Sequence, residues 1–188
     1  MLTYHSVAEI YESLDGTRER LRATLAGLSP EAEDFRDSPE RWTIAEIVEH
    51  LSLVEGQIGR IMSKFIDKVE AEGGAASGAG ATRTPLVDLN SHAERMAQGF
   101  DAPETARPKG GVPVSESLAR LGASSEAIRA LRPRVETLDL SSARFPHPAF
   151  GPLDIYQWLA VLGLHEERHR RQIETLKDSL AQRAAPQT

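Results

Sequence analysis

The stretch Leu162-Gly-Leu-His165-Glu-Glu-Arg-His169-Arg-Arg-Gln172-Ile173 decides the fold that this sequence predicts. It lies within residues 153–181, where apolar side chains recur every three or four residues, as they do along the buried face of a helix. His165, His169 and Gln172 occupy the middle of that face. The apolar positions on either side of them are Tyr156, Leu159, Leu162, Ile173, Leu176 and Leu180. The sequence therefore predicts a long amphipathic helix with polar side chains halfway along its apolar stripe.

Two further helices are predicted in the first part of the chain. Residues 6–28 carry apolar side chains at helical spacing, with Ser6 as a suitable N-cap and Ser29-Pro30 as the end of the helix. A second pattern opens at Thr43-Ile-Ala-Glu46, in which Thr43 and Glu46 have the spacing of a capping box. It extends to about residue 70, where a glycine-rich segment begins.

The third predicted helix follows Ser115. Pro133 is expected to kink or interrupt it, because proline removes one helical hydrogen bond. The proline- and aromatic-rich segment 145–152 predicts a turn, with Pro152 in the first turn of the last helix. No strand-like alternation is evident. Four amphipathic helices predict an all-α four-helix bundle, which we expect to form a single domain over residues 1–188.

The connection between the second and third helices is unusually long. Residues 71–113 lack sustained periodicity, contain several prolines and include the low-complexity segment 73–80, although residues 86–100 could hold a short helix. Long connections of this kind are usually lids, binding loops or flexible segments. Residues 183–188 are expected to form a flexible tail.

Composition excludes several classes of function. The net charge is −6, which argues against nucleic acid as the main partner, since phosphate binding needs clustered Lys and Arg. The chain has no cysteine, so it offers no disulfide, thiolate nucleophile or Cys-based zinc site. The absence of cysteine fits a reducing cytoplasm, and we expect a cytoplasmic protein without a signal peptide or membrane span.

His165 and His169 have a spacing suited to metal binding. Residues four apart on a helix differ by about 40° of rotation and about 6 Å of rise, so both rings can converge on one point. Two buried histidines without partners would each cost about 1–3 kcal/mol per unsatisfied polar group. An ion shared by the two rings removes part of that cost.

His50 supplies a third ring. It lies in the middle of the second predicted helix, on its apolar face. We therefore predict one divalent metal ion, Zn, Ni, Fe or Mn, on His50, His165 and His169, since imidazole does not choose among these metals. Three protein ligands leave coordination positions open for water or substrate, as in catalytic sites.

The alternative is a bundle whose histidines are hydrogen-bonded to protein groups and hold no metal. A lone core histidine is commonly satisfied by a neighbouring carbonyl, and histidine pairs on helices often lie at the surface. The other histidines, His5, His92 and His147, are predicted to be exposed or to make local turn contacts.

Three polar residues near the histidines have two interpretations each. Glu46 is a candidate general base one turn before His50, or simply the capping-box partner of Thr43. Gln172 is a candidate substrate-binding residue, or a hydrogen-bond partner of a ring nitrogen. Glu166 has E-x-x-H spacing with His169, but the second such motif of a di-iron bundle is absent. Glu166 is therefore expected to point sideways, toward a helix–helix seam or solvent.

Two segments resemble a known family. The stretch Arg41-Trp-Thr-Ile-Ala-Glu46-Ile-Val-Glu-His50-Leu51 is similar to the helix-two motif of the DinB-like superfamily, also called YfiT-like metal-dependent hydrolases. The stretch from His147-Pro-Ala-Phe-Gly-Pro to Trp158, followed by His165-x-x-x-His169-Arg-Arg-Gln172, is similar to its helix-four motif. Phe100-Asp-Ala-Pro-Glu104 resembles a connecting stretch common in the family.

The resemblance implies a four-helix bundle with a long connection between helices two and three. It also implies a metal on one histidine of helix two and two of helix four, which match His50, His165 and His169. It further implies a homodimer. Characterised members include enzymes that depend on low-molecular-weight thiols.

We therefore expect a metal-dependent enzyme acting on a small molecule. The metal would activate a low-molecular-weight thiol, making the protein an S-transferase, or water, making it a hydrolase. The alternative is a non-catalytic dimeric bundle that binds a metal or small ligand without turnover.

Overall fold

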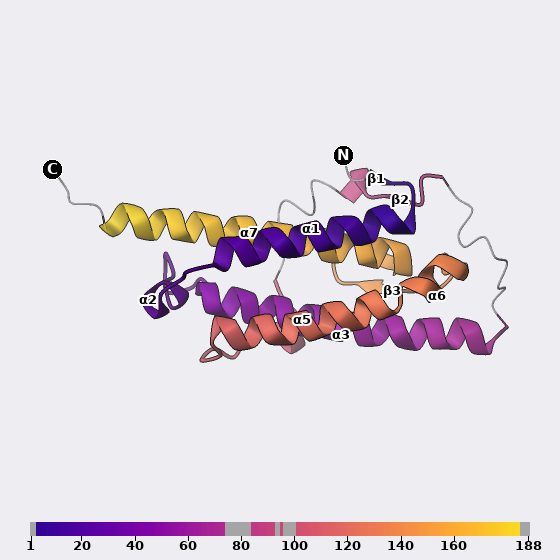
Figure 1. Ribbon diagram of the computed structural model, residues 1–188, viewed down its shortest axis with the longest axis horizontal. Coiled ribbons are helices and arrows are strands. Elements are labelled where there is room, and N and C mark those ends of the chain that lie inside the picture. The colour runs from indigo at the N-terminus through magenta and orange to yellow at the C-terminus, as the bar shows by residue number, and fades with distance from the viewer. Residues whose placement is uncertain (1–2, 74–83, 93–94, 96–100, 185–188) are drawn as a thin grey trace.

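A computed structural model of the chain describes residues 3–73, 84–92, 95 and 101–184. In that part of the chain, four long helices form the body of the molecule (Figure 1). They are α1 (Val7–Leu25), α3 (Ile44–Ala71), α5 (Val114–Ala130) and α7 (Ile155–Ala184). α1 packs beside α7, and α3 packs beside α5, so the helices form two layers. The predicted all-α four-helix bundle is confirmed.

The direction of the helices explains the long connection. α1 and α7 run the same way, and α3 and α5 run together in the opposite direction (Figure 1). α3 has 28 residues and therefore spans about 42 Å at 1.5 Å per residue. Because α3 ends at the end of the bundle opposite to the start of α5, the chain must travel back along the bundle before α5 can begin.

The helix ends follow the predicted capping chemistry in most places. The Ser6 side chain accepts a hydrogen bond from the Glu9 amide at the start of α1. Thr43 and Glu46 form both bonds of the capping box at the start of α3. The third predicted helix breaks before Pro133, where α6 (Arg132–Thr137) follows α5.

Several predicted boundaries differ from the structure: α5 begins at Val114, before Ser115, and α7 spans Ile155–Ala184 and not 153–181. α1 ends at Leu25, three residues before the predicted end. Ser29-Pro30 was predicted to end a helix, but it begins the short α2 (Pro30–Glu33). The Ser29 side chain accepts a hydrogen bond from the Ala32 amide, and proline suits the first turn of a helix.

The sequence predicted helices and turns only, and this is wrong in two places where short strands pair. β1 (Thr3–Tyr4) pairs with β2 (Val87–Asp88). β3 (Arg144–His147) and β4 (Gly151–Asp154) form an antiparallel hairpin, with His147 opposite Gly151. Pro152 thus lies in β4 and not in the last helix. Gly151 has a φ of 71°, a backbone conformation that glycine adopts without strain, and this closes the hairpin.

The connection between α3 and α5 contains two short helical turns in its described part. They are η1 (Asn90–His92) and η2 (Glu104–Ala106). The short helix predicted within residues 86–100 is replaced over residues 87–92 by β2 and η1, and the remainder of it, apart from residue 95, lies outside the described residues. Residues 74–80 of the low-complexity segment 73–80 and most of the predicted tail also lie outside them.

The core consists of two apolar clusters separated along the bundle. On α7 the buried residues of the first cluster end at Leu162 and those of the second begin at Ile173. On α3 the second cluster ends at Leu51, and the first begins at Met62. Between the clusters lies a group of buried or half-buried polar side chains that we call the polar layer: Arg18, His50, Glu55, His165, Glu166 and His169.

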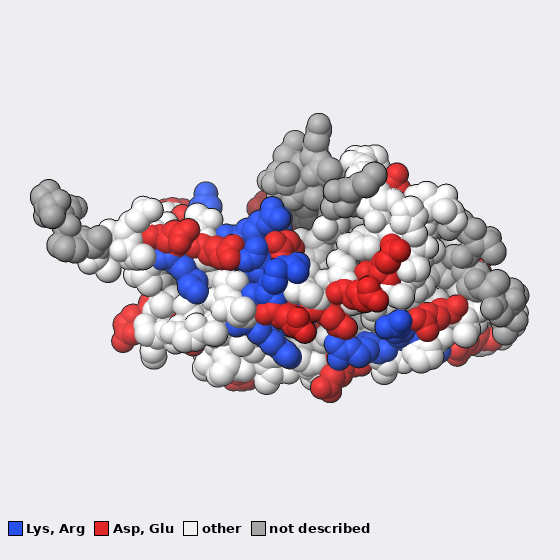
Figure 2. Space-filling model, turned by 45° about the horizontal axis from the view of Figure 1, so that its top comes forward, with Lys and Arg blue, Asp and Glu red and all other residues white. Residues whose placement is uncertain are grey.

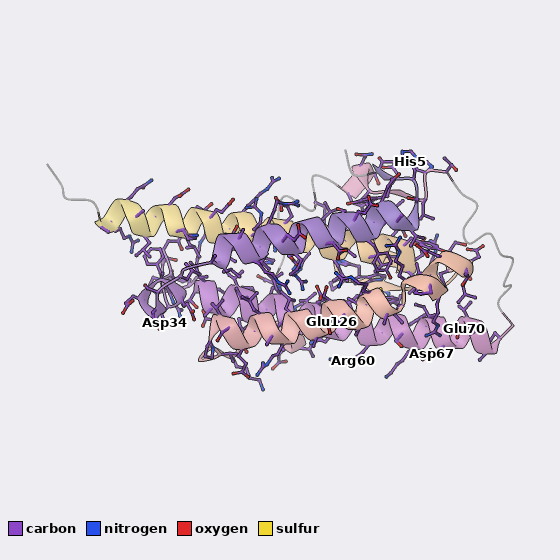
Figure 3. All side chains as sticks on the ribbon, in the orientation of Figure 1. His5, Asp34, Arg60, Asp67, Glu70 and Glu126 are labelled. Atoms are coloured by element: carbon purple, nitrogen blue, oxygen red, sulfur yellow. The ribbon has the colours of Figure 1, made fainter. Side chains whose placement is uncertain are left out.

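The surface carries charges of both signs. On the face shown in Figure 2, acidic and basic side chains are interspersed over the helices. Ion pairs such as Arg134 with Glu70 and Asp67 join neighbouring helices on the outside, and Asp67 and Glu70 are labelled on α3 in Figure 3. None of the helices in the described ranges has the length and apolar character to cross a membrane.

Candidate metal centre

Three histidine rings meet in the polar layer. His50 comes from α3, and His165 and His169 come from successive turns of α7. One ring nitrogen from each residue lies within 4.8 Å of the other two, and the Nε2 atoms of His50 and His165 are 3.2 Å apart. Small side-chain rotations would bring all three to the roughly 2.1 Å that imidazole nitrogens keep from one ion. The predicted convergence is therefore present.

Hydrogen bonds fix which nitrogen of two rings faces the others. His50 donates from Nδ1 to the carbonyl oxygen of Ala106 at 2.7 Å. His169 donates from Nδ1 to the side-chain oxygen of Gln172 at 2.9 Å. In a neutral ring the other nitrogen, Nε2, then carries a lone pair. Second partners of this kind are what metal-binding histidines typically have, so the donor set fits a metal ion.

Burial also keeps these rings neutral. It lowers the pKa of His50, lowers that of His169 to about 3 and places that of His165 well below its usual range. The charge of Arg168 lowers all three pKa values further. Neutral imidazole is the form that binds metal ions, so protons would compete little with a metal at neutral pH.

The polar layer is fixed by a buried ion network beside the histidines. Arg18 of α1 contacts Glu166 of α7 at 2.7 Å and Glu55 of α3 at 2.5 Å, and all three residues are at most 7% exposed. A second guanidinium nitrogen of Arg18 donates to the carbonyl oxygen of Leu121 in α5. Because Arg18 links all four long helices, it sets the distance between the helices that carry the histidines. Glu166 lies at a helix seam, as predicted.

The returning connection is held on α3 at three points next to His50. Ala106 accepts from His50, Thr105 accepts from Gln57 at 2.6 Å, and the Glu49 carboxylate accepts from the amides of Lys109 and Gly110. The segment around η2 is therefore a fixed wall of the site. Sequence analysis predicted a long connection here but did not identify these contacts.

A cleft of about 230 Å³ opens beside His50 and His165. Its apolar walls come from α3, from the β3–β4 hairpin and from α7, and Ala102, Pro103 and Ala106 of the connection complete it. Apolar walls with a few polar groups at one place are typical of small-molecule sites. The larger side chains that line it are Trp42, Ile58, Ile61, Phe145, Trp158 and Leu162.

Arg168 is the charged side chain at the histidine end of this cleft. Its guanidinium lies 3.0 Å from Nε2 of His169 and donates to it. No carboxylate among the described residues lies within ion-pair distance of it, whereas the nearby Arg170 and Arg171 both pair with Glu167. Sequence analysis did not single out Arg168 as a site residue. Its position three residues after His165 was the available signal.

His147 was predicted to be exposed or in a local turn contact, and exposure is wrong. Its Nδ1 accepts from the Ala149 amide, which is a turn contact, but the residue is only 8% exposed. Its ring stacks on Phe150 at 4.4 Å and lies 4.9 Å from Trp158, and it lines the cleft. The hairpin turns both Phe145 and His147 inward. His5, in contrast, is exposed at the outer end of α1 (Figure 3).

The remaining candidates lie outside the cleft lining. The Glu46 carboxylate accepts from the Thr43 amide at 2.8 Å and pairs with Arg36 at 3.4 Å, so it is occupied by capping. Gln172 accepts a hydrogen bond from Nδ1 of His169, on the side of the ring away from Nε2, and this was one of its two predicted roles. The structure thus gives both residues a supporting position and brings neither into the cleft.

The sequence profile of the DinB superfamily matches residues 13–173. The chain belongs to the DinB superfamily. This match includes all three histidines of the candidate metal centre and most of α1 and α7. The resemblance in the two histidine motifs is thereby confirmed at the level of the family.

Relatives of this DinB superfamily chain support the same fold. It is 23% identical over 161 residues to the uncharacterised protein YuaE of Bacillus subtilis (strain 168), covering 83% of this chain and 90% of YuaE. The crystal structure of TT2238, a four-helix bundle protein, superposes with a TM-score of 0.60 at 19% identity, over 90% of this chain and 99% of that one. The structural likeness concerns the fold alone.

Proposed function

We propose that this DinB superfamily protein is a metal-dependent enzyme. Its divalent metal ion would be held by His50, His165 and His169, and its small-molecule substrate would enter the cleft next to them. The observation that carries this proposal is the position of the cleft, since His50 and His165 both line it and present Nε2 toward each other. Three imidazole ligands leave further coordination positions for a reactant.

The side chains around the centre have separate tasks in this proposal. Ala106 and Gln172 hold His50 and His169 in the tautomer that can bind an ion. The Arg18 network fixes the spacing of the helices. The apolar walls exclude water from the reacting atoms, which strengthens electrostatic interactions there. A divalent ion at this centre would lower the pKa of a bound thiol or water molecule and so supply the nucleophile.

The cleft favours a thiol over water as the activated group. A hydrolase normally uses a general base beside its water, and none of the described residues that line the cleft is a carboxylate. A thiol needs less help, because coordination to a metal removes its proton directly. With no cysteine in the chain, that thiol would be a low-molecular-weight cosubstrate.

The test combines metal content with activity. Protein purified without an affinity tag would be assayed for its bound metal and for conjugation of glutathione, bacillithiol and mycothiol to a panel of small electrophiles. We expect His50→Ala to abolish both properties. His5→Ala, at an exposed histidine before the start of α1, is the matched control and should leave both unchanged. Retention of metal and activity in His50→Ala would contradict the proposal.

A non-catalytic binding bundle is the second candidate. The absence of a carboxylate among the described lining residues favours it as well, because binding needs no base. Metal binding without thiol conjugation in those assays, and without hydrolysis of ester and amide substrates in a further assay, would support this second candidate. For either function we propose a homodimer, as the family resemblance implies, and sedimentation equilibrium of the full chain would measure the oligomeric state.

A further inference from the structure

The chemical character of the side chains that line the cleft changes stepwise along α7. Trp158, Val161, Leu162, His165 and Arg168 all line it, and they lie on one face of the helix at spacings of three and four residues. At 1.5 Å per residue, Arg168 is about 5 Å beyond His165, and Trp158 is about 10 Å before it. The cleft therefore has a cationic end, a histidine centre and an aromatic end.

α3 and the segment just before it line the facing side of the cleft, with the chain running in the opposite direction. His50 lies against His165, and Val54, Ile58 and Ile61 continue toward the aromatic end. Trp42 lies on the other side of His50, with ring centroids 4.8 Å apart, and so it belongs to the cationic end. Both sides of the cleft thus place a histidine at its centre and aliphatic side chains beyond it toward the aromatic end, whereas the cation comes from α7 alone among the described lining residues.

The aromatic end is a preformed wall. Phe145 and Trp158 stack with centroids 4.5 Å apart and an interplanar angle of 8°. The indole nitrogen of Trp158 donates to the Phe145 carbonyl oxygen at 3.2 Å, so its polar atom is already satisfied. A ligand that packs here gains apolar and aromatic contact without having to satisfy the indole N–H. This end suits a hydrocarbon group, preferably an aromatic ring.

The positive charge at the cationic end of the cleft is not balanced by a carboxylate among the described residues. Arg168 is half-buried and has no carboxylate partner within the described ranges, and no carboxylate lines the cleft there. A guanidinium in apolar surroundings favours an anion, and its planar donor pair matches a carboxylate. A phosphate dianion would need a second cationic donor such as a lysine, and none is found among the described lining residues. One carboxylate is the anion that this end fits.

We propose that the cleft binds a small monocarboxylate with an apolar, preferably aromatic, body. Its carboxylate lies on Arg168, its body lies against Phe145 and Trp158, and the atoms between them lie beside His50 and His165. This proposal rests on the proposed function and identifies the acceptor of the reaction. A polar thiol cosubstrate would not occupy the apolar walls, so the acid is the electrophilic partner.

The two tryptophans of the chain, Trp42 and Trp158, both line the cleft, so intrinsic fluorescence reports its occupancy directly. Titrations would use 3-phenylpropionate, its neutral analogue 3-phenylpropanamide and propionate, each with metal-free and zinc-loaded protein. We expect the aromatic acid to bind at least about tenfold more tightly than the amide, in line with one charge-assisted pair, and more tightly than propionate.

Arg168→Gln should lower the affinity for the acid at least about tenfold and leave that for the amide unchanged. Arg168→Lys, which keeps the charge, should retain part of the preference. Arg171→Gln is the matched control, because Arg171 lies on the same helix with its side chain 72% exposed. Circular dichroism and zinc content of each variant are measured alongside, so that a loss of fold or of metal is recognised.

Equal binding of acid and amide, or an Arg168→Gln variant that keeps the preference for the acid, would overturn the inference. Zinc binding to His50, His165 and His169 with no binding of the acid would overturn it as well, and would leave the proposed metal centre intact. Binding of the acid by a protein that takes up no zinc would instead overturn the proposed function and leave the ligand class standing.

Discussion

His169 donates its Nδ1 proton to the side-chain oxygen of Gln172 at 2.9 Å, one turn further along α7. In a neutral ring this bond leaves the lone pair on Nε2, which accepts from Arg168 in this structure, and it fixes the orientation of the ring. We predict that Gln172→Ala weakens metal binding about 10- to 100-fold, the usual effect of removing such a partner. Competition with a chelator of known affinity measures the change.

Gln182→Ala provides the control for that measurement. Gln182 is exposed on the same helix, well beyond the histidines, and its replacement should leave the affinity unchanged. An unaltered affinity in Gln172→Ala would show that the bond to His169 has no part in holding a metal.

Arg18 is predicted to dominate the stability of the polar layer. Arg18→Met leaves Glu55 and Glu166 buried without their cation, which typically costs about 3–5 kcal/mol in the free energy of unfolding. Arg20→Met removes a surface ion pair with Glu167, and its cost should be about 0–1 kcal/mol. Urea unfolding at pH 7 compares them, and similar losses in the two variants would refute the structural role of Arg18.

Glu55 should make stability depend on pH. Burial raises the pKa of Glu55 to about 7, while Arg18 opposes the rise, and one of its carboxylate oxygens has no hydrogen-bond partner within the described structure. An unfolded Glu titrates near 4.3, so between pH of about 4.3 and 7 the folded state binds a proton that the unfolded state has released. This contribution to stability is therefore complete at low pH and is lost as the pH rises through about 7.

The measurement is the difference in unfolding free energy between Glu55→Gln and the natural sequence across pH 4 to 8. The variant cannot titrate here, so its unfolding free energy relative to that of the natural protein should rise with pH, by at most about 4 kcal/mol. The comparison at each pH removes the opposite contribution of the buried histidines, whose lowered pKa values favour folding as the pH rises. A difference that stays constant with pH would contradict this account.

Glu46→Gln separates the two predicted roles of Glu46. Glutamine can still accept the hydrogen bond from the Thr43 amide, but it cannot act as a base. Because the structure places this carboxylate in the capping box and against Arg36, we expect the variant to keep its metal, and any thiol-conjugating or hydrolytic activity, within about twofold, the effect of a lost exposed ion pair. A large loss of activity with unchanged metal content would restore Glu46 as the base.

The parts of the site that sequence analysis predicted depend on local periodicity. The turn spacing of His165 and His169, the apolar neighbours of His50 and the Thr43–Glu46 capping box all follow from helix geometry. Each of these features is encoded within a few consecutive residues, and the structure reproduces it.

The parts that sequence analysis missed depend on contacts between distant segments. Arg18 pairs with Glu166 across 148 positions, and nothing in either local sequence marks the partner. In β3 the side chains of Phe145 and His147 alternate inward, but the strand has only four residues and includes a proline, so its sequence pattern is indistinguishable from that of a turn. Because the hairpin was missed, the aromatic wall of the cleft was missed with it.

The most direct test of the metal centre is the metal content of untagged protein by elemental analysis, after equilibration with zinc and exhaustive dialysis. We predict close to one ion per chain for the natural sequence, and less than about a tenth of that for His50→Ala, since loss of one of three ligands removes most of the affinity. A natural protein that retains no ion, or three single histidine variants that all retain a full ion, would contradict the account.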